Sequence, residues 1–161
     1  MVQGLSRLFR YTLDVGQRPT VRLEEEIGAV RQYLDIEKVR LGERLEYHID
    51  VAEGLSRLQL PGLILQPLVE NSVKHGIAPL TGGGRIEVVC RQEGDRVRIE
   101  VRDNGGGLEI ASQAEGAGFG LRSVRERLAP HYGAGHDFAL KEEGGVAAVL
   151  KLPIQGRGDD G

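Results

Sequence analysis

Apolar residues recur along the chain at two periods, and these periods predict its secondary structure. Helical spacing predicts a short helix over residues 5–13, a long one from Leu23 to about Leu41, a buried one over 63–76, and an amphipathic one that starts at Leu121 and ends before Pro130 or near Gly133. Alternation of apolar and polar residues predicts strands over 45–51, 85–92, 96–102, 138–141 and 146–154.

Short turns connect two pairs of these strands, and this decides the fold class. Residues 93–95 join the second strand to the third, and residues 142–145 join the last two, so both pairs form antiparallel hairpins. Parallel neighbours would need a helix-length crossover instead. We therefore predict an α+β fold with a mixed, mostly antiparallel sheet and helices on one face, preceded by one or two N-terminal helices.

The bulk composition is that of an ordinary soluble globular protein. The chain has 161 residues, 40% of them hydrophobic, which suits one domain with a real core. Its net charge is −3 with Lys and Arg spread along it, so we expect no nucleic-acid partner and no direct membrane contact. No apolar run reaches the ~18 residues of a membrane span, and no signal peptide is evident, which favours a cytoplasmic location. The single cysteine, Cys90, is interpreted as a small buried apolar residue of a strand.

Glycine is frequent, with 24 residues, and its clusters lie between the periodic segments. Asp103-Asn104-Gly105-Gly106-Gly107 follows a predicted strand, and Gly116-Ala117-Gly118-Phe119-Gly120 opens a predicted helix. A carboxylate followed by backbone without side chains suits a small ligand close to the chain, and N–H groups at a helix start suit an anion. No Gly-Lys-Ser/Thr follows and no βαβ unit surrounds the glycines, which excludes phosphate-loop and dinucleotide-binding motifs. A flexible surface loop is the alternative.

A polar cluster interrupts the otherwise apolar helix over 63–76. Asn71, Lys74 and His75 are spaced at i, i+3 and i+4, which places them on one face of an α-helix. An amide oxygen is a suitable ligand for Mg²⁺, which usually arrives with substrate phosphates, and Lys74 can neutralise phosphate charge. The alternative is a helix C-terminus whose Lys74 and His75 complement the dipole, with Glu70 and Lys74 as a surface pair.

Three segments together resemble the motifs of the GHKL ATPase superfamily, which contains gyrase, MutL-type repair proteins, heat-shock chaperone ATPases and histidine kinases. Residues 70–76, Glu-Asn-Ser-Val-Lys-His-Gly, resemble its N box. Residues 103–107 resemble its Asp-x-Gly-x-Gly box, and residues 116–121 its second glycine box. The amino-acid sequence over residues 5–11, 33–40, 65–71 and 120–128 is similar to that of LytS/YehU-type sensor histidine kinases. The resemblance covers residues 5–154.

The resemblance implies a Bergerat-type α/β sandwich that binds ATP and Mg²⁺. It implies that Asn71 binds Mg²⁺, that Lys74 and His75 contact phosphates, and that Asp103 bonds the adenine N6 group. Gly105 and Gly107 would shape the pocket, and the 118–121 segment would form the lid. The implied cofactor-binding residues are Asn71, Lys74, His75, Asp103, Gly105, Gly107, Gly118, Phe119, Gly120 and Leu121.

The same resemblance implies a function within a longer protein. Sensor kinases of this type transfer the γ-phosphoryl group of Mg·ATP to a histidine for relay to a response regulator. That histidine is expected upstream of Leu5, so we expect no catalytic residue in this chain and no autophosphorylation by it. We divide the chain into a helical segment over 1–42 from the end of the dimerisation and phosphoacceptor region, an ATP-binding domain over 43–155 and a flexible tail over 156–161. The response regulator is the expected transient partner, and upstream helices are expected to form a homodimer and, in the full-length protein, to be preceded by an inner-membrane anchor.

Two departures from the superfamily pattern bear on rival functions. GHKL hydrolases carry a general-base Glu four residues before the Asn, and here that position is Pro67, so hydrolysis should be slow. Gly144-Gly145-Val146 stands where the family often has Gly-Thr, which predicts a small loss of lid or base contacts. The rivals are a GHKL-type ATP hydrolase, and a non-catalytic nucleotide- or protein-binding module that acts through the 23–41 helix.

Overall fold

A computed structural model describes residues 10–11, 13–15, 17–78, 81–105, 117–142 and 144–154, with 117–121 described by their backbone only. The first described residues, 10–15 apart from position 12, are helical. The elements that follow, in chain order, are β1 (Val21–Arg22), α2 (Leu23–Leu41), η1 (Gly42–Arg44), β2 (Leu45–Val51), β3 (Gln59–Leu60), α3 (Leu65–Asn71), η2 (Ser72–Ile77), β4 (Gly84–Glu93), β5 (Arg96–Asp103), α5 (Ala117–Tyr132), η3 (Gly133–Gly135), β6 (Asp137–Glu142) and β7 (Val146–Pro153).

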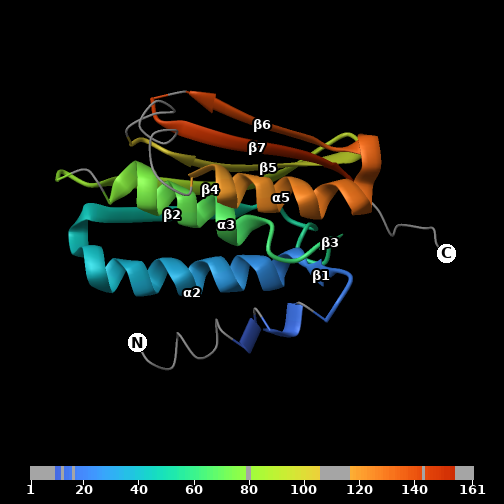
Figure 1. Cartoon of the computed structure of the whole chain (residues 1–161), viewed down its shortest axis with the longest axis horizontal. Helices are drawn as coiled ribbons and strands as arrows, with labels where there is room; N and C mark the ends of the chain where they lie inside the picture. Colours follow the sequence, from blue (N-terminus) through green and yellow to red (C-terminus); the bar gives the residue numbers. More distant parts are fainter. Residues whose placement is uncertain are drawn as a thin grey trace.

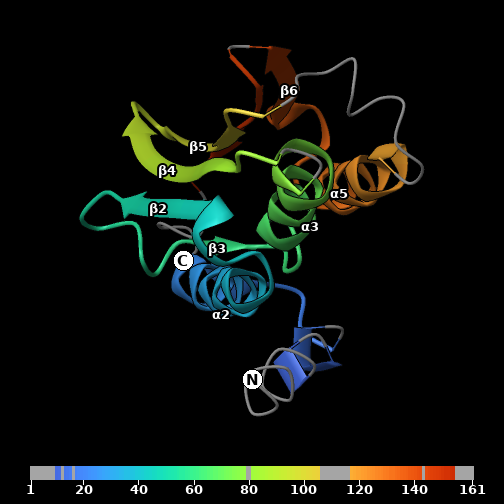
Figure 2. The same cartoon turned by 90° about the vertical axis from the view of Figure 1, so that its left-hand side faces the viewer.

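The main sheet has five strands in the order β2-β4-β5-β7-β6. β2 and β4 are parallel, and the other three neighbouring pairs are antiparallel. Helices α2, α3 and α5 lie on one face of this sheet (Figures 1 and 2). The predicted fold class, α+β with a mixed, mostly antiparallel sheet, is therefore confirmed.

The core fills the space between the sheet and the three helices. Alternate residues of the central strands, such as Val88 of β4 and Ile99 of β5, are fully buried because one face of each strand is turned toward the helices. Leu34 of α2 and Leu128 of α5 close the core from the helical side. Cys90 is fully buried on β4, and burial raises the pKa of its thiol to about 12, so its interpretation as an apolar core residue is confirmed.

Helix α2 has the bounds predicted from its periodicity. Its apolar stripe is buried, and Gly42 ends it with a φ of 62° and a backbone N–H that donates to the carbonyl of Lys38. That left-handed φ is the conformation that glycine adopts without steric cost, which explains why the helix stops there.

Helix α5 contains Pro130 in its last turn and ends at Tyr132, next to Gly133, in agreement with the second of its two predicted ends. Two features differ from the sequence predictions. The small antiparallel pair β1–β3 has two residues in each strand, which is too short to produce a periodic pattern. The predicted 63–76 helix starts at Leu65 and changes at Ser72 from an α-helix to the π-helix η2.

Among the helices that the structure describes, none combines the length and apolarity needed to cross a bilayer.

Candidate functional site

Asp103 is a buried carboxylate at the end of the central strand β5. Its side chain is 5% exposed. Its Oδ1 accepts hydrogen bonds from the backbone N–H of Gly105 (2.9 Å) and of Val146 (3.4 Å), and the hydroxyl of Ser72 also bonds to the carboxylate. Burial raises the pKa of Asp103 above its usual value, and these three hydrogen bonds offset part of the increase. A carboxylate kept at this cost in a core is typical of a binding site.

Three glycines allow the chain to pass close to Asp103. A Cβ atom on Gly76 would lie 2.7–2.9 Å from the carboxyl atoms of Asp103. A Cβ on Gly105 would lie 2.0 Å from the carbonyl oxygen of Gly76, and one on Gly145 would lie 2.0 Å from the carbonyl oxygen of Asp103. All three distances are too short for a side chain, so the glycines permit this packing of η2, the β5 end and the β6–β7 turn.

The β6–β7 turn thus lies against Asp103. The resemblance connected Gly144-Gly145-Val146 with lid or base contacts, but this backbone contact with Asp103 was not predicted. Gly145 has a φ of 144°, and the backbone N–H of Val146 donates to Asp103. Because this contact uses the backbone, it does not depend on which side chain follows Gly145.

Asn104 holds the end of β5 to the start of β4. Its Oδ1 accepts a hydrogen bond from the backbone N–H of Arg85 (2.7 Å), and its own N–H donates to the Arg85 carbonyl (3.3 Å). The second residue of the Asp-Asn-Gly-Gly-Gly motif therefore fixes the strand end that carries Asp103.

The helix that carries the polar cluster packs against Asp103, but the cluster does not have the predicted α-helical geometry. Asn71 is the last residue of α3 and is half-buried, His75 of η2 is half-buried, and Lys74 is exposed. The α-helical spacing that placed them on one face ends at Ser72, because a π-helix bonds each residue to the fifth one along and has a wider turn. π-helical turns are frequent at functional sites.

Contacts from η2 connect this cluster to Asp103. Ser72 bonds to the Asp103 carboxylate, and Gly76 packs against it. Burial, and then the charge of Lys74, lower the pKa of His75 below its usual value, so this imidazole is neutral at pH 7. The sequence-predicted N-box and Asp-x-Gly-x-Gly residues therefore meet in space.

Part of the predicted site, Gly107, lies outside the described residues, and so does the predicted tail over 156–161. Gly118, Phe119, Gly120 and Leu121 are in the first turns of α5, and their side chains are outside the description. Within the part of the chain that the structure describes, no group of three His, Cys, Asp or Glu side chains is placed to hold a metal ion.

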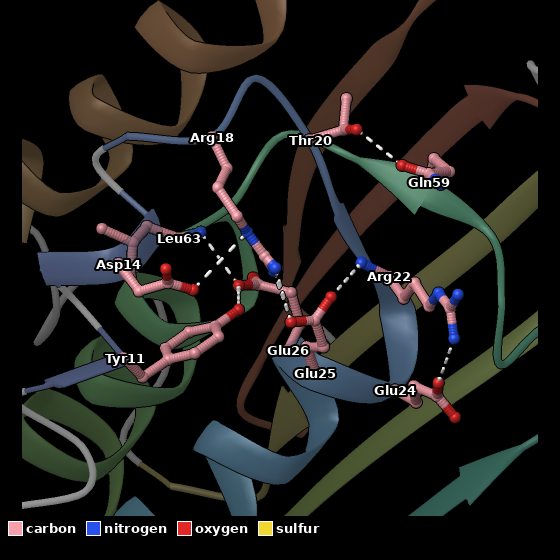
Figure 3. Close-up of polar contacts among 10 residues, drawn as sticks. All are labelled: Tyr11, Asp14, Arg18, Thr20, Arg22, Glu24, Glu25, Glu26, Gln59 and Leu63. Carbon is pink, nitrogen blue, oxygen red and sulfur yellow. Dashed lines mark hydrogen bonds and ion pairs between the residues drawn. The ribbon is translucent and has the colours of Figure 1, made fainter.

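A second buried carboxylate, Glu26 of α2, holds the start of α3 (Figure 3). It is 1% exposed and accepts hydrogen bonds from the backbone N–H groups of Leu63, Ile64 and Leu65. No role was predicted for Glu26 from the sequence. The signal was its position, three residues after Leu23 and four before Val30, which puts a charged residue on the apolar stripe of α2.

Residues 58–156 match the family described as histidine kinase-, DNA gyrase B- and HSP90-like ATPase. The chain belongs to this family. Residues 1–45 match a second family, described as histidine kinase. The resemblance to GHKL ATPases and to sensor histidine kinases is confirmed.

The chain is similar in sequence to sensor histidine kinases. Sensor histidine kinase BtsS of Escherichia coli K12 is 38% identical over 157 residues, which cover 95% of this chain and 27% of BtsS. Sensor protein LytS of Enterococcus faecalis is 27% identical over 163 residues, which cover 94% of this chain and 28% of LytS. The chain thus spans about a quarter of the length of these relatives, at 27–28%.

A solved structure supports the fold assignment. The catalytic domain of histidine kinase ThkA superposes with a TM-score of 0.62 at 17% identity, covering 84% of this chain and 95% of that domain. At this identity the likeness concerns the fold, and it agrees with the predicted sandwich of a mixed sheet and helices.

Proposed function

We propose that this chain is the ATP-binding catalytic domain of a two-component sensor histidine kinase, and that Asp103 binds the adenine base. One observation carries the proposal: a buried carboxylate surrounded by glycine backbone lies against the helix that bears Asn71. Two backbone N–H groups and the Ser72 hydroxyl bond to the Asp103 carboxylate, and because its two oxygens offer about four lone-pair positions, it can still accept from the N6 amino group of adenine.

The residues around Asp103 fit ATP and Mg²⁺ by their chemistry. When bound, Mg·ATP supplies the γ-phosphoryl group that is transferred. Asn71 offers a neutral amide oxygen to the cation, exposed Lys74 offers a positive charge to the phosphates, and the neutral imidazole of His75 adds a hydrogen-bonding group. These residues contribute positioning and charge neutralisation, as expected for phosphoryl transfer.

The remaining parts of the reaction belong to a longer protein. We place the receiving histidine and the dimerising helices upstream of Leu5, the response regulator as a transient partner, and any membrane anchor in an additional N-terminal region. Gly107, Gly118, Phe119, Gly120 and Leu121 complete the pocket and its lid in this proposal.

Pro67 distinguishes this function from that of an ATP hydrolase. It is the third residue of α3, where a missing N–H costs little, and its ring has no group that can polarise water. Phosphate release by the chain in Mg·ATP should therefore be slow. The hydrolase function would be favoured instead if each chain rapidly released many phosphate ions and if this release depended on Asn71.

The test is the binding of Mg·ADP and Mg·ATP to Asp103→Asn, measured by titration calorimetry. The asparagine keeps Oδ1 for Gly105 and Val146, so the fold persists, but it presents an NH₂ group to the adenine N6 donor. We expect affinity to fall roughly 10- to 100-fold, since a hydrogen bond to a charged group contributes about 1.5–3 kcal/mol.

The matched control is Asp50→Asn, which removes an exposed carboxylate paired with Arg91 on the sheet. Its affinity should equal that of the wild type. A folded Asp103→Asn variant with wild-type affinity would contradict the role of Asp103, and a wild-type chain that binds no adenine nucleotide would contradict the proposed function.

A further inference from the structure

Glu26 connects three parts of the chain through one carboxylate (Figure 3). Its Oε1 accepts from the backbone N–H of Ile64 (3.0 Å) and Leu65 (3.1 Å). Its Oε2 accepts from the backbone N–H of Leu63 (2.9 Å) and from the hydroxyl of Tyr11 (2.5 Å). Four donors thus converge on one side chain that is 1% exposed, and they come from the N-terminal segment and from the start of α3.

The carboxylate acts as the N-cap that α3 lacks within its own sequence. The residue before the helix is Ile64, which has no side-chain oxygen, and the structure shows no side-chain cap from it. Glu26 instead satisfies N–H groups at the helix start and places a negative charge at the positive end of the helix dipole. Leu63 is held there with a φ of 59°, an unfavourable conformation for leucine that needs support from its surroundings.

Tyr11 brings the N-terminal segment to this cap. The Tyr11 ring packs against the core, and burial followed by the charge of Glu26 raises the pKa of its hydroxyl, which therefore stays a donor at neutral pH. Next to it, Arg18 contacts both Asp14 and Glu25, which ties the segment to the first turn of α2. Residues 10–15 thus contact the segment that leads into α3 in two ways, through the hydrogen bond from Tyr11 to Glu26 and through buried Val15, which packs against Gly62.

The start of α3 leads directly to the proposed nucleotide site. α3 and η2 form a continuous helix from Leu65 to Ile77, and Asn71 lies six residues after Leu65, a rise of about 9 Å. Further along, Ser72 and Gly76 contact Asp103. A change in how the helix begins would displace these residues too, because close-packed interiors transmit strain.

We infer that Glu26 is a positioning residue for the nucleotide site, and that Tyr11 makes this positioning sensitive to the segment that precedes α2. This rests on the proposed function. The hydrogen bond from Tyr11 stabilises the arrangement of Glu26 that holds α3 in place, so displacement of residues 10–15 weakens nucleotide binding without any contact to the nucleotide.

The test compares Tyr11→Phe with Tyr47→Phe. Tyr47 also donates its hydroxyl to a carboxylate of α2, Asp35 (2.6 Å), but this hydrogen bond is exposed. Mg·ADP affinity is measured by calorimetry at a temperature where all variants are fully folded. We expect Tyr11→Phe to weaken binding about 3- to 10-fold, in line with the loss of one hydrogen bond, and Tyr47→Phe to leave it unchanged.

A second readout reports on the helix without nucleotide. Native-state hydrogen exchange of the Ser72–Ile77 amides should be faster in Tyr11→Phe than in the wild type and unchanged in Tyr47→Phe. Glu26→Gln keeps one acceptor oxygen but loses the charge. If Tyr11 acts through Glu26, the double variant Tyr11→Phe/Glu26→Gln should lose less Mg·ADP affinity than the product of the fold-losses of the two single variants.

The outcomes separate the two hypotheses. A wild-type chain that fails to bind Mg·ADP contradicts the proposed function. In that case the hydrogen exchange of the Ser72–Ile77 amides still decides whether Tyr11 affects η2. If the wild type binds and Tyr11→Phe lowers only the unfolding temperature, with affinity and η2 exchange as in the wild type, Tyr11 and Glu26 have a structural role alone and the inference is wrong.

Discussion

The carboxylate of Asp103 is unfavourable for folding, and this is informative about its role. Its folded-state pKa is raised by burial. A carboxyl group with a raised folded pKa contributes stability that is complete below its unfolded pKa and is lost as pH rises through the folded pKa. At neutral pH the ionised group therefore costs folding free energy, and removing the charge should not destabilise the chain. Asp103→Asn should thus unfold no earlier than the wild type while it loses nucleotide affinity, a combination that is typical of binding residues.

At the same site, Gly76→Ala should both destabilise the fold and disturb Asp103. The added Cβ would lie 2.7–2.9 Å from the carboxyl atoms of Asp103, so the carboxylate or the helix has to move. We expect a loss of about 1–3 kcal/mol in the free energy of unfolding, as for other overpacked sites, together with weaker Mg·ADP binding.

Gly28→Ala is the matched control for that substitution. Gly28 lies inside α2, and its added Cβ would meet nothing within 4 Å. Alanine is the better helix former, so this variant should gain up to about 1 kcal/mol in urea unfolding. If both variants behaved alike, the close approach of Gly76 to Asp103 would be refuted.

At the scale of elements, the connection from β3 into α3 determines where the site helix begins. Glu26 holds it from α2, and Leu63 adopts a left-handed backbone conformation within it. The start of α3 therefore depends on contacts with a residue 37–39 positions away in sequence rather than on a local cap. This is why the sequence pattern located the helix but not what fixes its position.

The conformation of Leu63 predicts a reversal of the usual order of alanine and glycine. Both Leu63→Ala and Leu63→Gly remove the side chain, but only glycine adopts a φ of 59° without strain. We expect Leu63→Gly to be more stable than Leu63→Ala by about 1 kcal/mol in urea unfolding. At exposed Val39 of α2, which is 70% exposed, alanine should be more stable than glycine by a similar amount. If the alanine variant were more stable than the glycine variant at both positions, the left-handed conformation of Leu63 would be contradicted.

At the scale of the whole molecule, the sequence predicted what periodicity and local turns determine. The bounds of α2 and the strand β2 agree with their apolar patterns, and both hairpins form where the turns were predicted. The π-helix at Ser72 was not predicted, and two of its residues, Ser72 and Gly76, lie against Asp103. The roles of Glu26 and Val146 also escaped the sequence analysis, since both depend on contacts between distant segments.

The predicted division at residue 42 can be tested because α2 shares the core of the sheet. Five of its apolar residues are at most 8% exposed in the main core cluster, namely Leu23, Ile27, Val30, Leu34 and Leu41. Burial of each contributes about 1.5–3 kcal/mol, so together they match the 5–15 kcal/mol of a whole domain. We therefore expect a chain of residues 17–161 to unfold cooperatively in urea, and a chain of residues 43–161 to show a shallow transition with a reduced m-value. A steep, cooperative transition for residues 43–161 would show instead that the ATP-binding domain folds without α2, which then belongs with the region before it.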